Sequence, residues 1–530
     1  MSSGGTGHPY EGPARPHQMR FPWPRATTGF QGGPLPAIFP PDAADQPLYQ
    51  RDTAAGPARQ IRNRRTARRR RRFQRQAGGA SGGRDRMERR DVYNRLFGRL
   101  DTQRSTSYVL RLAFVSMGGI FLDGYDIVII GLGLAGIKSV FHPTPFDLVL
   151  IGVIALFGVM IGSLMSGYVT DRVGRKVMFI LDLILLVAAA LLSGLSQNIY
   201  ELVIFRFLVG VGVGIDFPVA TSYVSELVPA RSRGRYMTLL INFFNVGALV
   251  AVIVAYKLYP LGIDVAWRYM LALSAAPALL ILFMRLGIEE SPRWLFERGY
   301  IDEAIKVVEK ATGLAISAED KDQLRRSRVP ERGSGSYVEL LTKYTRDAVF
   351  IGILYMLFQI VFISTGVLEP LFAKSLGVAG ETTALLYWSF AIVGVVIISI
   401  LVETPLGRRN TGLIGFGGTT ALIAALTFIP HSYSLVIVSA YILLSLVTNL
   451  AATLHFLYSP ELFPTRIRAT AEGWKQGIGR AAGIAVALLS PFVSFDTLLY
   501  IILGFSVLAF LNQFLLARET RGKTLEEISG

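Results

Sequence analysis

DLVLIGVIALFGVMIGSLMSGYVT (147–170) is a run of apolar and small residues, and the charged sequence DRVGRK (171–176) follows it directly. The hydrocarbon core of a bilayer is about 30 Å thick, and a helix needs roughly 20 mostly apolar residues to cross it. The stretch therefore predicts a helix that crosses a membrane and ends at a charged loop.

Similar segments follow one another from Tyr108 onward, with short breaks between them. The predicted spans lie near 108–137, 147–170, 177–195, 199–224, 236–258, 267–287, 347–370, 382–403, 411–430, 433–457, 470–491 and 495–516. A long polar stretch separates the first six from the last six. We therefore predict an all-α membrane protein of twelve transmembrane helices in two six-helix halves, 108–288 and 347–517.

Three polar segments flank these halves: an N-terminal tail (1–107), a linker (289–346) and a C-terminal tail (518–530). In the linker, IDEAIKVVEKATG (301–313) has apolar residues at helical spacing, so we expect short amphipathic helices there.

The N-terminal tail carries most of the net charge. It contains 21 Arg, no Lys and 8 Asp or Glu, a net of +13 out of +16 for the chain. It is rich in Gly and Pro and has no apolar periodicity, so we expect it to be disordered. One reading is docking on anionic lipid; the other is a dispensable tail, with Met87 as an alternative start. Arginine runs also suit nucleic acid, but we expect no nucleic-acid partner.

We do not expect an enzyme, because no nucleophile–base pair, metal cluster or phosphate loop appears in the right context. Hydrophobic residues make up 51% of the chain and charged residues 17%, against about 25% charged in soluble domains. There is no cysteine, and His142, His431 and His455 show no metal-ligand spacing. The glycines of RFLVGVGVG (206–214) lie in an apolar span rather than a strand–helix unit, which favours helix packing over nucleotide binding.

Basic residues set the expected orientation. With the N-terminal tail in the cytoplasm, ten Lys or Arg fall in short cytoplasmic loops (172, 175, 176, 231, 233, 235, 408, 409, 466 and 468), and four fall on the other side (138, 257, 268 and 374). This bias predicts both termini in the cytoplasm of a plasma-membrane protein.

The two halves look duplicated. ELVPARSRG (226–234) matches ELFPTRIRA (461–469) at an offset of 235, and GRK (174–176) matches GRR (407–409) at 233. Six-helix repeats of this kind are a known transporter architecture, with the substrate site near the membrane midplane between the halves.

These motifs resemble those of the major facilitator superfamily over about residues 107–529. GYVTDRVGRK (167–176) looks like its loop signature, and RFLVGVGVG, EESPRWL (289–295), ELFPTRIRA and ETRGKTLEEI (519–528) look like sugar-porter signatures. FLDGYDIVIIG (121–131) and GWKQGIGRAAG (473–483) are more similar to phosphate and aromatic-acid proton symporters. At the second loop signature Thr404 replaces the expected aspartate and Glu403 precedes it, which puts a symmetric second gate in doubt.

Acidic residues inside spans are costly, so they are candidates for proton coupling. Asp123 and Asp126 lie three apart on the first helix and share one face. Carboxylates that share a low-dielectric site resist double ionisation. Asp216 lies late in the fourth helix, where coupling and gating are both open; the alternative for all three is a structural role.

Arg480 in the eleventh helix is the candidate anion-binding residue, because the resemblance puts a substrate-facing arginine there and a guanidinium grips carboxylate or phosphate. A buried structural pair is the alternative. Polar or aromatic lining is expected from Tyr125, Gln359, Asn449 and Trp474; Trp474 could instead be an interfacial residue.

The loop signatures predict a gate. We expect Asp171, Arg172 and Arg175 to form an ion-pair network with Glu226 that biases one state of the carrier. The other residues of the predicted gate or signature are Gly167, Gly174, Arg206, Arg408, Glu461 and Arg466. Arg206 could serve structure, coupling or interfacial anchoring.

We therefore predict a proton-coupled symporter that carries a small hydrophilic metabolite by alternating access. An organic acid or another anion such as phosphate is favoured, and a sugar or polyol carrier is the alternative. A facilitator or exporter, and a sensor that does not transport, are further classes. No cofactor is expected beyond the proton gradient, and sodium stays open as the coupling ion. The protein is expected to work as a monomer in the lipid bilayer.

Overall fold

The computed structural model describes residues 96–98, 100, 106–229, 232–326, 336–367, 373–377, 380–430 and 432–521. The expectations for the arginine-rich part of the tail, for Met87, for His431 and for the last residues fall outside this range. All structural statements below concern the described residues.

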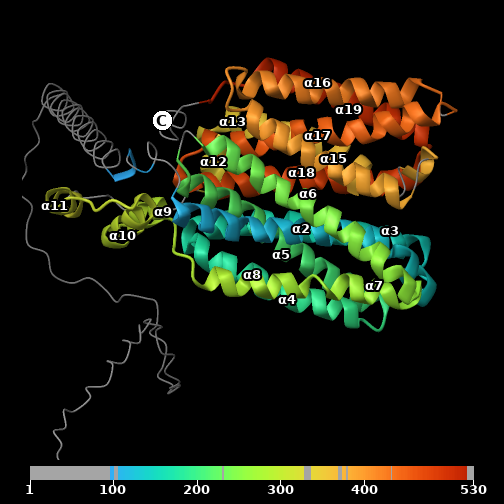
Figure 1. Cartoon of the computed structure of the whole chain (residues 1–530), viewed down its shortest axis with the longest axis horizontal. Coiled ribbons are helices and arrows are strands. Elements are labelled where there is room, and N and C mark those ends of the chain that lie inside the picture. Colours follow the sequence, from blue (N-terminus) through green and yellow to red (C-terminus); the bar gives the residue numbers. More distant parts are fainter. Residues whose placement is uncertain are drawn as a thin grey trace, which may run out of the picture. The chain divides into compact units, whose positions relative to one another are not determined.

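The N-terminal half is a set of long helices that run back and forth (Figure 1). They are α2 (Ser107–Phe141), α3 (Pro145–Val173), α4 (Arg175–Leu195), α5 (Ile199–Leu227), α6 (Arg233–Leu258) with a short 3-10 turn η1 (Tyr259–Leu261), and α7 (Ile263–Ala272) with α8 (Ala275–Leu286). Together α7 and α8 make up the sixth span. The break between them falls just before Pro277, which cannot donate a backbone hydrogen bond to the preceding turn.

The C-terminal half repeats this pattern. It contains α13 (Thr345–Phe362), which continues into a π-helical turn η2 (Ile363–Val367), then α15 (Glu381–Leu401), α16 (Gly407–Phe428), α17 (Ser434–Leu462), α18 (Thr465–Leu489) with a 3-10 turn η3 (Ser490–Phe492), and α19 (Phe495–Leu516). The two halves meet mainly through α3 against α18 and α6 against α15.

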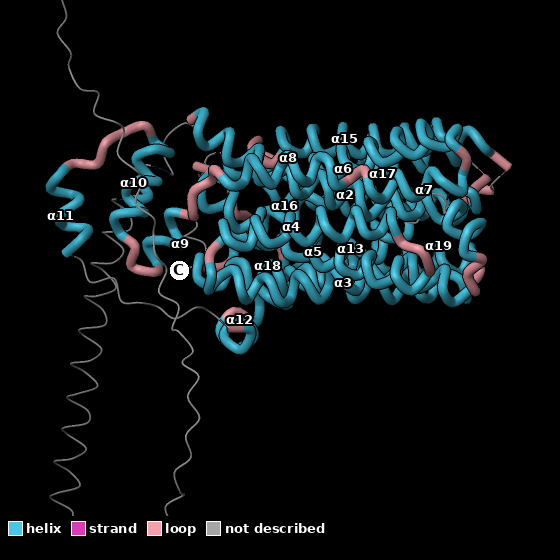
Figure 2. The backbone as a smooth tube through the Cα atoms, turned by 90° about the horizontal axis from the view of Figure 1, so that it is seen from below, coloured by secondary structure: helices cyan, strands magenta, loops and turns pink. Residues whose placement is uncertain are grey.

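Eleven helical segments among the described residues are long and apolar enough to cross a membrane. The one remaining predicted span, the eleventh in chain order, is α18, which lies among the others in the bundle (Figure 2). It carries five charged residues, Arg466, Arg468, Glu472, Lys475 and Arg480, and four of them are at most 2% exposed. Because these charges face protein and not lipid, the helix can span the bilayer despite its low hydropathy.

Large apolar side chains cover the outside of the bundle. Half or more of the side chain is exposed at Ile204, Leu280, Phe283, Ile400, Leu508 and Leu515, among others. Exposed apolar surface on this scale marks contact with an apolar environment, which for a bundle of such helices is lipid.

Glycines bring α3 and α5 into direct backbone contact. A Cβ built on Gly210 would overlap the Ala155 carbonyl oxygen, and one on Gly214 would overlap that of Val159. The glycines of RFLVGVGVG therefore pack helices, as the sequence predicted.

The duplication predicted from the motifs extends to individual hydrogen bonds. Arg233 Nε donates to the Ser225 carbonyl and Arg468 Nε to the Pro460 carbonyl, and both partners differ by the motif offset of 235. The carboxylate of Glu290 accepts from the backbone N–H groups of Arg175 and Lys176 at the start of α4, and that of Glu519 accepts from those of Arg408 and Arg409 in the first turn of α16.

The linker forms a small helical layer at the end of the bundle that holds these loop motifs, called here the signature end. α9 (Pro292–Glu297), α10 (Ile301–Thr312) and α11 (Ala318–Arg326) form this layer beyond the end of the bundle, whereas α12 (Tyr337–Lys343) lies against its flank and contacts α13 and α18 (Figure 2). The helix predicted at 301–313 is present as α10. Phe97, from the segment before α2, packs edge-to-face on Phe296 with 5.6 Å between the ring centroids.

Candidate functional site

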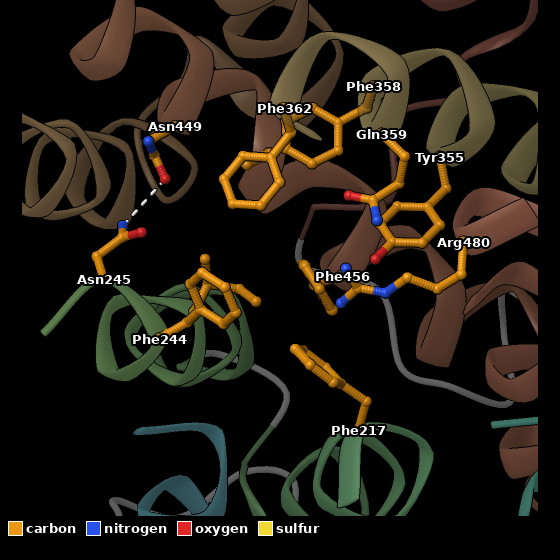
Figure 3. Close-up of a pocket in the computed structure, with 12 residues that line it drawn as sticks. Phe217, Phe244, Asn245, Tyr355, Phe358, Gln359, Phe362, Asn449, Phe456 and Arg480 are labelled. Carbon is orange, nitrogen blue, oxygen red and sulfur yellow. Dashed lines mark hydrogen bonds between the residues drawn. The ribbon is translucent and has the colours of Figure 1, made fainter. Parts of the chain in front are cut away.

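A cavity lies between the two halves, with walls from α5 and α6 on one side and α13, α17 and α18 on the other (Figure 3). Its volume of about 30 Å³ holds one or two water molecules. Five phenylalanines give it an apolar wall: Phe217, Phe244, Phe358, Phe362 and Phe456. Asn245, Tyr355, Gln359, Asn449 and Arg480 add polar groups, and Ile241 and Ala452 complete the lining.

Arg480 is the charged residue of this lining. Its guanidinium points between Phe456 and Phe217 (Figure 3), and its Cζ atom lies 5.8 Å from the centre of the Phe217 ring. The side chain is 2% exposed, yet Nε and Nη1 have no hydrogen-bond partner, and no carboxylate among the described residues pairs with it. A buried guanidinium without a counter-charge is costly, so the cavity is suited to an anion.

The remaining polar groups differ in how well they are satisfied. Asn245 Nδ2 donates to Asn449 Oδ1 at 3.0 Å, which joins the two halves across the cavity. Gln359 Nε2 has no partner. The Tyr355 hydroxyl donates to Gln476 Oε1 at 2.7 Å. The free donors that remain therefore belong to Gln359 and Arg480.

A buried pair of opposite charges lies next to Tyr355. Lys475 and Glu472 are separated by 2.5 Å and are at most 2% exposed, so they are buried rather than interfacial. Gln476 Nε2 donates to Glu472 Oε1 at 3.3 Å, which connects the pair to Tyr355.

Of the predicted lining residues, Arg480, Gln359 and Asn449 reach the cavity, and two others lie elsewhere. The Tyr125 hydroxyl donates to the Met270 carbonyl at 2.8 Å, which joins α2 to α7. Trp474 is half-buried and faces Gly352 on α13. Neither residue lines the cavity: Tyr125 stands on α2, which contributes no lining residue, and Trp474 stands on α18 beside Arg480 but is not part of the lining.

Asp126 and Arg206 form a buried pair between α2 and α5. Their closest side-chain atoms, Oδ1 and Nη1, are 3.9 Å apart, and Arg206 Nη2 donates to the Asp126 backbone carbonyl at 2.6 Å. Neither carboxylate oxygen of Asp126 has a hydrogen-bond partner. Arg206 is 1% exposed, so it is not an interfacial anchor.

Asp123 and Asp216 belong to a different group of charges. Asp216 Oδ1 lies 2.7 Å from Arg285 Nη2, and Arg285 Nη1 lies 2.9 Å from Asp182 Oδ2. Asp123 lies one turn of α2 beyond Gly119, where an added Cβ would overlap Arg285 Nη2 and Asp216 Oδ2. The two aspartates of the first helix thus face two different arginines.

The gate network joins both halves at the signature end. Arg175 Nη2 lies 3.1 Å from Asp171 Oδ1 and 3.0 Å from Glu226 Oε1. Arg468 Nη1 from the other half reaches the same Glu226 oxygen at 3.0 Å. Asp171 Oδ2 accepts hydrogen bonds from the backbone and hydroxyl of Thr470, both at 2.8 Å. These contacts close the bundle at this end.

Two arginines of the predicted gate and signature set lie outside this network: Arg172, which was expected in it, and Arg466. Arg172 stacks on the Tyr168 ring, with its Cζ 3.2 Å from the ring centre, and does not contact Glu226. Arg466 forms two hydrogen bonds with Glu339 of α12. They hold the pKa of Glu339 at about 2, below its ordinary value of 4.5.

The second gate is only partly symmetric with the first. Arg408 Nη1 lies 2.7 Å from Glu461 Oε2, which matches Arg175 and Glu226. Glu403 reaches Gly234 of the other half, but its Oε1 has no hydrogen-bond partner. The first gate has two hydrogen bonds at the corresponding place, so the doubt raised by Thr404 was justified.

Sequence reasoning missed several residues of these sites. Asp182 and Arg285 are ionisable residues inside predicted spans, so the same rule that singled out Asp123 would have found them. Asn245 is a polar residue inside the fifth span. The phenylalanines gave no signal, because apolar residues are common on every face of a membrane helix.

Twelve membrane helices in two repeated halves, with a buried cavity between them and a gate at one end, define a transporter of the major facilitator type. A family model described as "Sugar (and other) transporter" matches residues 112–530, and the chain belongs to this family of membrane transporters. It is therefore a carrier of small molecules and not an enzyme.

Similar proteins carry different substrates. The arabinose-proton symporter of Bacillus subtilis (strain 168) is 27% identical over 80% of this chain and 95% of its own length. The niacin transporter NiaP of Acinetobacter baylyi is 29% identical over 78% of this chain and 94% of its own length. A solved structure of the proton:xylose symporter XylE has a TM-score of 0.69 and 24% identity and covers 80% of this chain and 99% of that chain; it supports the fold alone.

Proposed function

We propose that this protein is a proton-coupled symporter of a small organic anion with an apolar, ring-sized body. The observation that carries the proposal is the buried, unpaired guanidinium of Arg480 in a cavity walled by five phenylalanines. A carboxylate would satisfy the free Nε and Nη1 donors, and the phenylalanine rings would contact the rest of the molecule.

The lining favours an organic acid over other substrates. A sugar presents hydroxyls on every side, and hydrogen-bonding partners would be needed for each. Asn245 and Asn449 already bond to each other, which leaves few such partners. Inorganic phosphate has no apolar part to lie against the phenylalanines. The niacin transporter among the relatives, whose named substrate is a carboxylic acid, supports this choice.

A sugar or polyol carrier is the second candidate. The match to the arabinose-proton symporter favours it, as do the amides of Gln359 and Asn449 in the cavity. The two candidates differ in their need for Arg480, because a neutral sugar requires no counter-charge.

Proton coupling is supported by the Asp126–Arg206 pair. The carboxylate is fully buried and held mainly by charge attraction at 3.9 Å, since its oxygens accept no hydrogen bond. Protonation would cancel the attraction and free Arg206 to move, which would link proton binding to a change of state. If sodium were the coupling ion instead, it would have to bind at the Asp126 carboxylate in place of the proton.

Alternating access is supported by the gate and by the size of the cavity. A cavity of about 30 Å³ is far smaller than the 300 Å³ or so of a typical ligand site, so the halves must move apart for the substrate to enter. The gate network is closed in this state, so entry would begin at the other end. We place the signature end in the cytoplasm of a plasma-membrane protein, because the short loops there are rich in arginine.

The test is uptake into proteoliposomes with an imposed inside-alkaline pH gradient. The labelled probes are nicotinate, an aliphatic carboxylate, inorganic phosphate and arabinose. We expect nicotinate-like acids to accumulate. Arg480→Gln should raise their half-saturation concentration about 10- to 100-fold, since a charged hydrogen bond contributes about 1.5–3 kcal/mol.

Two further variants complete this experiment. Asp126→Asn should abolish accumulation above equilibrium, and Arg235→Gln, an exposed arginine at the signature end, should behave like the parent. Arabinose uptake that survives Arg480→Gln would select the sugar carrier. Equilibration without accumulation would select a facilitator, and accumulation driven only by a sodium gradient would replace the proton.

A further inference from the structure

Three helices of the N-terminal half meet at a buried ionic group. Arg285 on α8 lies between Asp182 on α4 and Asp216 on α5, at 2.9 and 2.7 Å, and all three side chains are at most 3% exposed. Arg285 also donates to the backbone carbonyls of Phe179 and Ser116. Three acceptors therefore hydrogen-bond the guanidinium, and Asp216 adds an ion pair in which neither carboxylate oxygen accepts a hydrogen bond.

A third carboxylate is directed at this group from α2. Ser116, Gly119 and Asp123 are spaced three and four residues apart and so share one helix face. The Ser116 carbonyl accepts from Arg285 at 3.2 Å, and a Cβ on Gly119 would overlap both Arg285 Nη2 and Asp216 Oδ2. Asp123 lies one turn further along this face. It is fully buried, and neither of its oxygens has a hydrogen-bond partner.

The charges of this cluster do not balance. Three carboxylates and one guanidinium would sum to −2 if all were ionised, in a part of the protein that water does not reach. Among the described residues, no cation other than Arg285 pairs with them. Arg206 lies ten residues from Asp216, about 15 Å along α5, and it faces Asp126 on α2. The helix α6, packed on α2, has no charged side chain between residues 236 and 256.

Burying uncompensated charge costs several kcal/mol per group, and a carboxyl group avoids this cost by holding a proton. The Asp126–Arg206 pair needs no proton for neutrality, because it has one charge of each sign. The cluster needs bound protons for neutrality, because it has two negative charges in excess. Proton binding is thus required by charge balance at the cluster and not at the pair.

We infer that Asp123, Asp182, Asp216 and Arg285 form a second proton-binding centre, distinct from the Asp126–Arg206 pair, in which Asp123 takes up the proton. The proton adds to the Asp123 carboxylate and gives a neutral carboxylic acid, so the net charge of the cluster changes from −2 to −1. This inference rests on the proposed proton symport only for its role in transport, not for the binding itself.

The centre lies next to the substrate cavity. Asp216, which contacts Arg285, directly precedes Phe217, whose ring lines the cavity beside Arg480. If Arg285 shifts its contacts between Asp182 and Asp216, the position of Asp216 changes, and Asp216 is one residue from the cavity wall. This adjacency gives proton binding a short route to the substrate site.

The test is infrared difference spectroscopy of the purified full-length chain in lipid, titrated from about pH 5 to about pH 8. The carbonyl stretch of a protonated carboxylic acid is separate from that of a carboxylate and reports the proton directly. We expect the parent to show an Asp123-dependent band, a component that Asp123→Asn lacks, in addition to any component that Asp126 contributes. Asp126→Asn and the exposed control Asp496→Asn should keep the Asp123-dependent band.

Loss of the band in Asp123→Asn should not result from misfolding. Asp123→Asn is isosteric and removes no hydrogen bond, and its elution profile and thermal midpoint should match those of the parent. A parent without the Asp123-dependent band over this range would overturn the inference, as would a band in Asp123→Asn that equals the parent's. Loss of the band on adding sodium at constant pH would make the cluster a sodium site and would also overturn it.

The outcomes separate this inference from the proposed function. A band that depends on Asp123, together with uptake that never exceeds equilibrium, would refute proton-driven symport and leave the binding centre in place. Proton-driven accumulation without the band would refute the centre and leave the symporter.

Discussion

Gly119 is the residue at which α2 comes closest to the buried charges of the N-terminal half. A Cβ there would overlap Arg285 and Asp216, whereas at Gly118 the nearest atom is Ile281 Cγ1 at 3.0 Å. We expect Gly119→Ala to lower the free energy of unfolding by about 1–3 kcal/mol, because the ion pairs must shift to admit the methyl group. The thermal unfolding midpoint of the detergent-solubilised protein measures this change.

Gly118→Ala is the matched control on the neighbouring residue. A flexible isoleucine side chain can move aside, and alanine gains about 0.5–1 kcal/mol over glycine inside a helix. Its thermal midpoint should stay near that of the parent. Equal losses in the two variants would mean that the face of α2 directed at Arg285 is not the one described here.

For single residues, the sequence predicted which residues matter better than it predicted where their side chains point. Arg480 and Asp126 could be singled out because a charge inside an apolar span needs a reason to be there. Tyr125 and Trp474 were expected in the cavity and point elsewhere, because a motif does not fix which face of a helix turns inward. Which arginine each aspartate faces depends on contacts between helices far apart in the chain.

Among the elements, α12 acts as a strap between the halves. The Tyr337 hydroxyl donates to the Leu164 carbonyl on α3, and Glu339 pairs with Arg466 on α18. Hydrogen bonds from Arg466 hold the pKa of Glu339 at about 2, against 4.5 ordinarily. A lowered pKa means that this stabilisation is complete above about pH 4.5 and is lost as pH falls toward 2.

We therefore expect Glu339→Gln to lower the thermal midpoint equally at about pH 5 and about pH 8, by the equivalent of about 1–3 kcal/mol. The comparison variant is Lys343→Gln. Lys343 also pairs with Glu339, at 2.9 Å, but it is 67% exposed, so its loss should be within about 0.5 kcal/mol. A loss from Glu339→Gln that grows between these two pH values would contradict the assigned protonation.

The elements themselves were largely predictable. Eleven spans have the length and apolar composition that a bilayer demands, and α10 appears where the apolar spacing predicted a helix. The exception is α18, which fails the test of apolarity because it carries five charged residues. It can still cross the membrane, because α3, α13 and α17 satisfy or enclose those charges. The breaks after Ala272 and at the π-helical turn η2 left no clear mark in the hydropathy pattern.

For the whole molecule, the closed state depends on contact between α3 and α18. A Cβ on Gly477 would touch the side chain of Leu164, so cysteines at these two positions lie within reach of a disulfide, whose Cβ atoms are about 4 Å apart. The chain has no cysteine of its own, so no background thiol competes.

We expect oxidation of the Leu164→Cys, Gly477→Cys double variant to join the halves and stop uptake, and reduction to restore it. Each single variant should transport under both conditions. Suppose that mass spectrometry shows complete cross-linking and that uptake still proceeds at the parental rate. The halves then need not separate between Leu164 on α3 and Gly477 on α18 during transport.

Glu226 accepts one arginine from each half, Arg175 and Arg468, at the same carboxylate oxygen. When the halves part, Arg468 withdraws and Arg175 remains, while Arg408 stays with Glu461. Glu226 and Glu461 each keep a cation, but the buried Arg468 loses its carboxylate partner, so the electrostatic cost of opening falls on one guanidinium. The consequence is kinetic: we expect the rate at which this latch opens to depend on the release of Arg468.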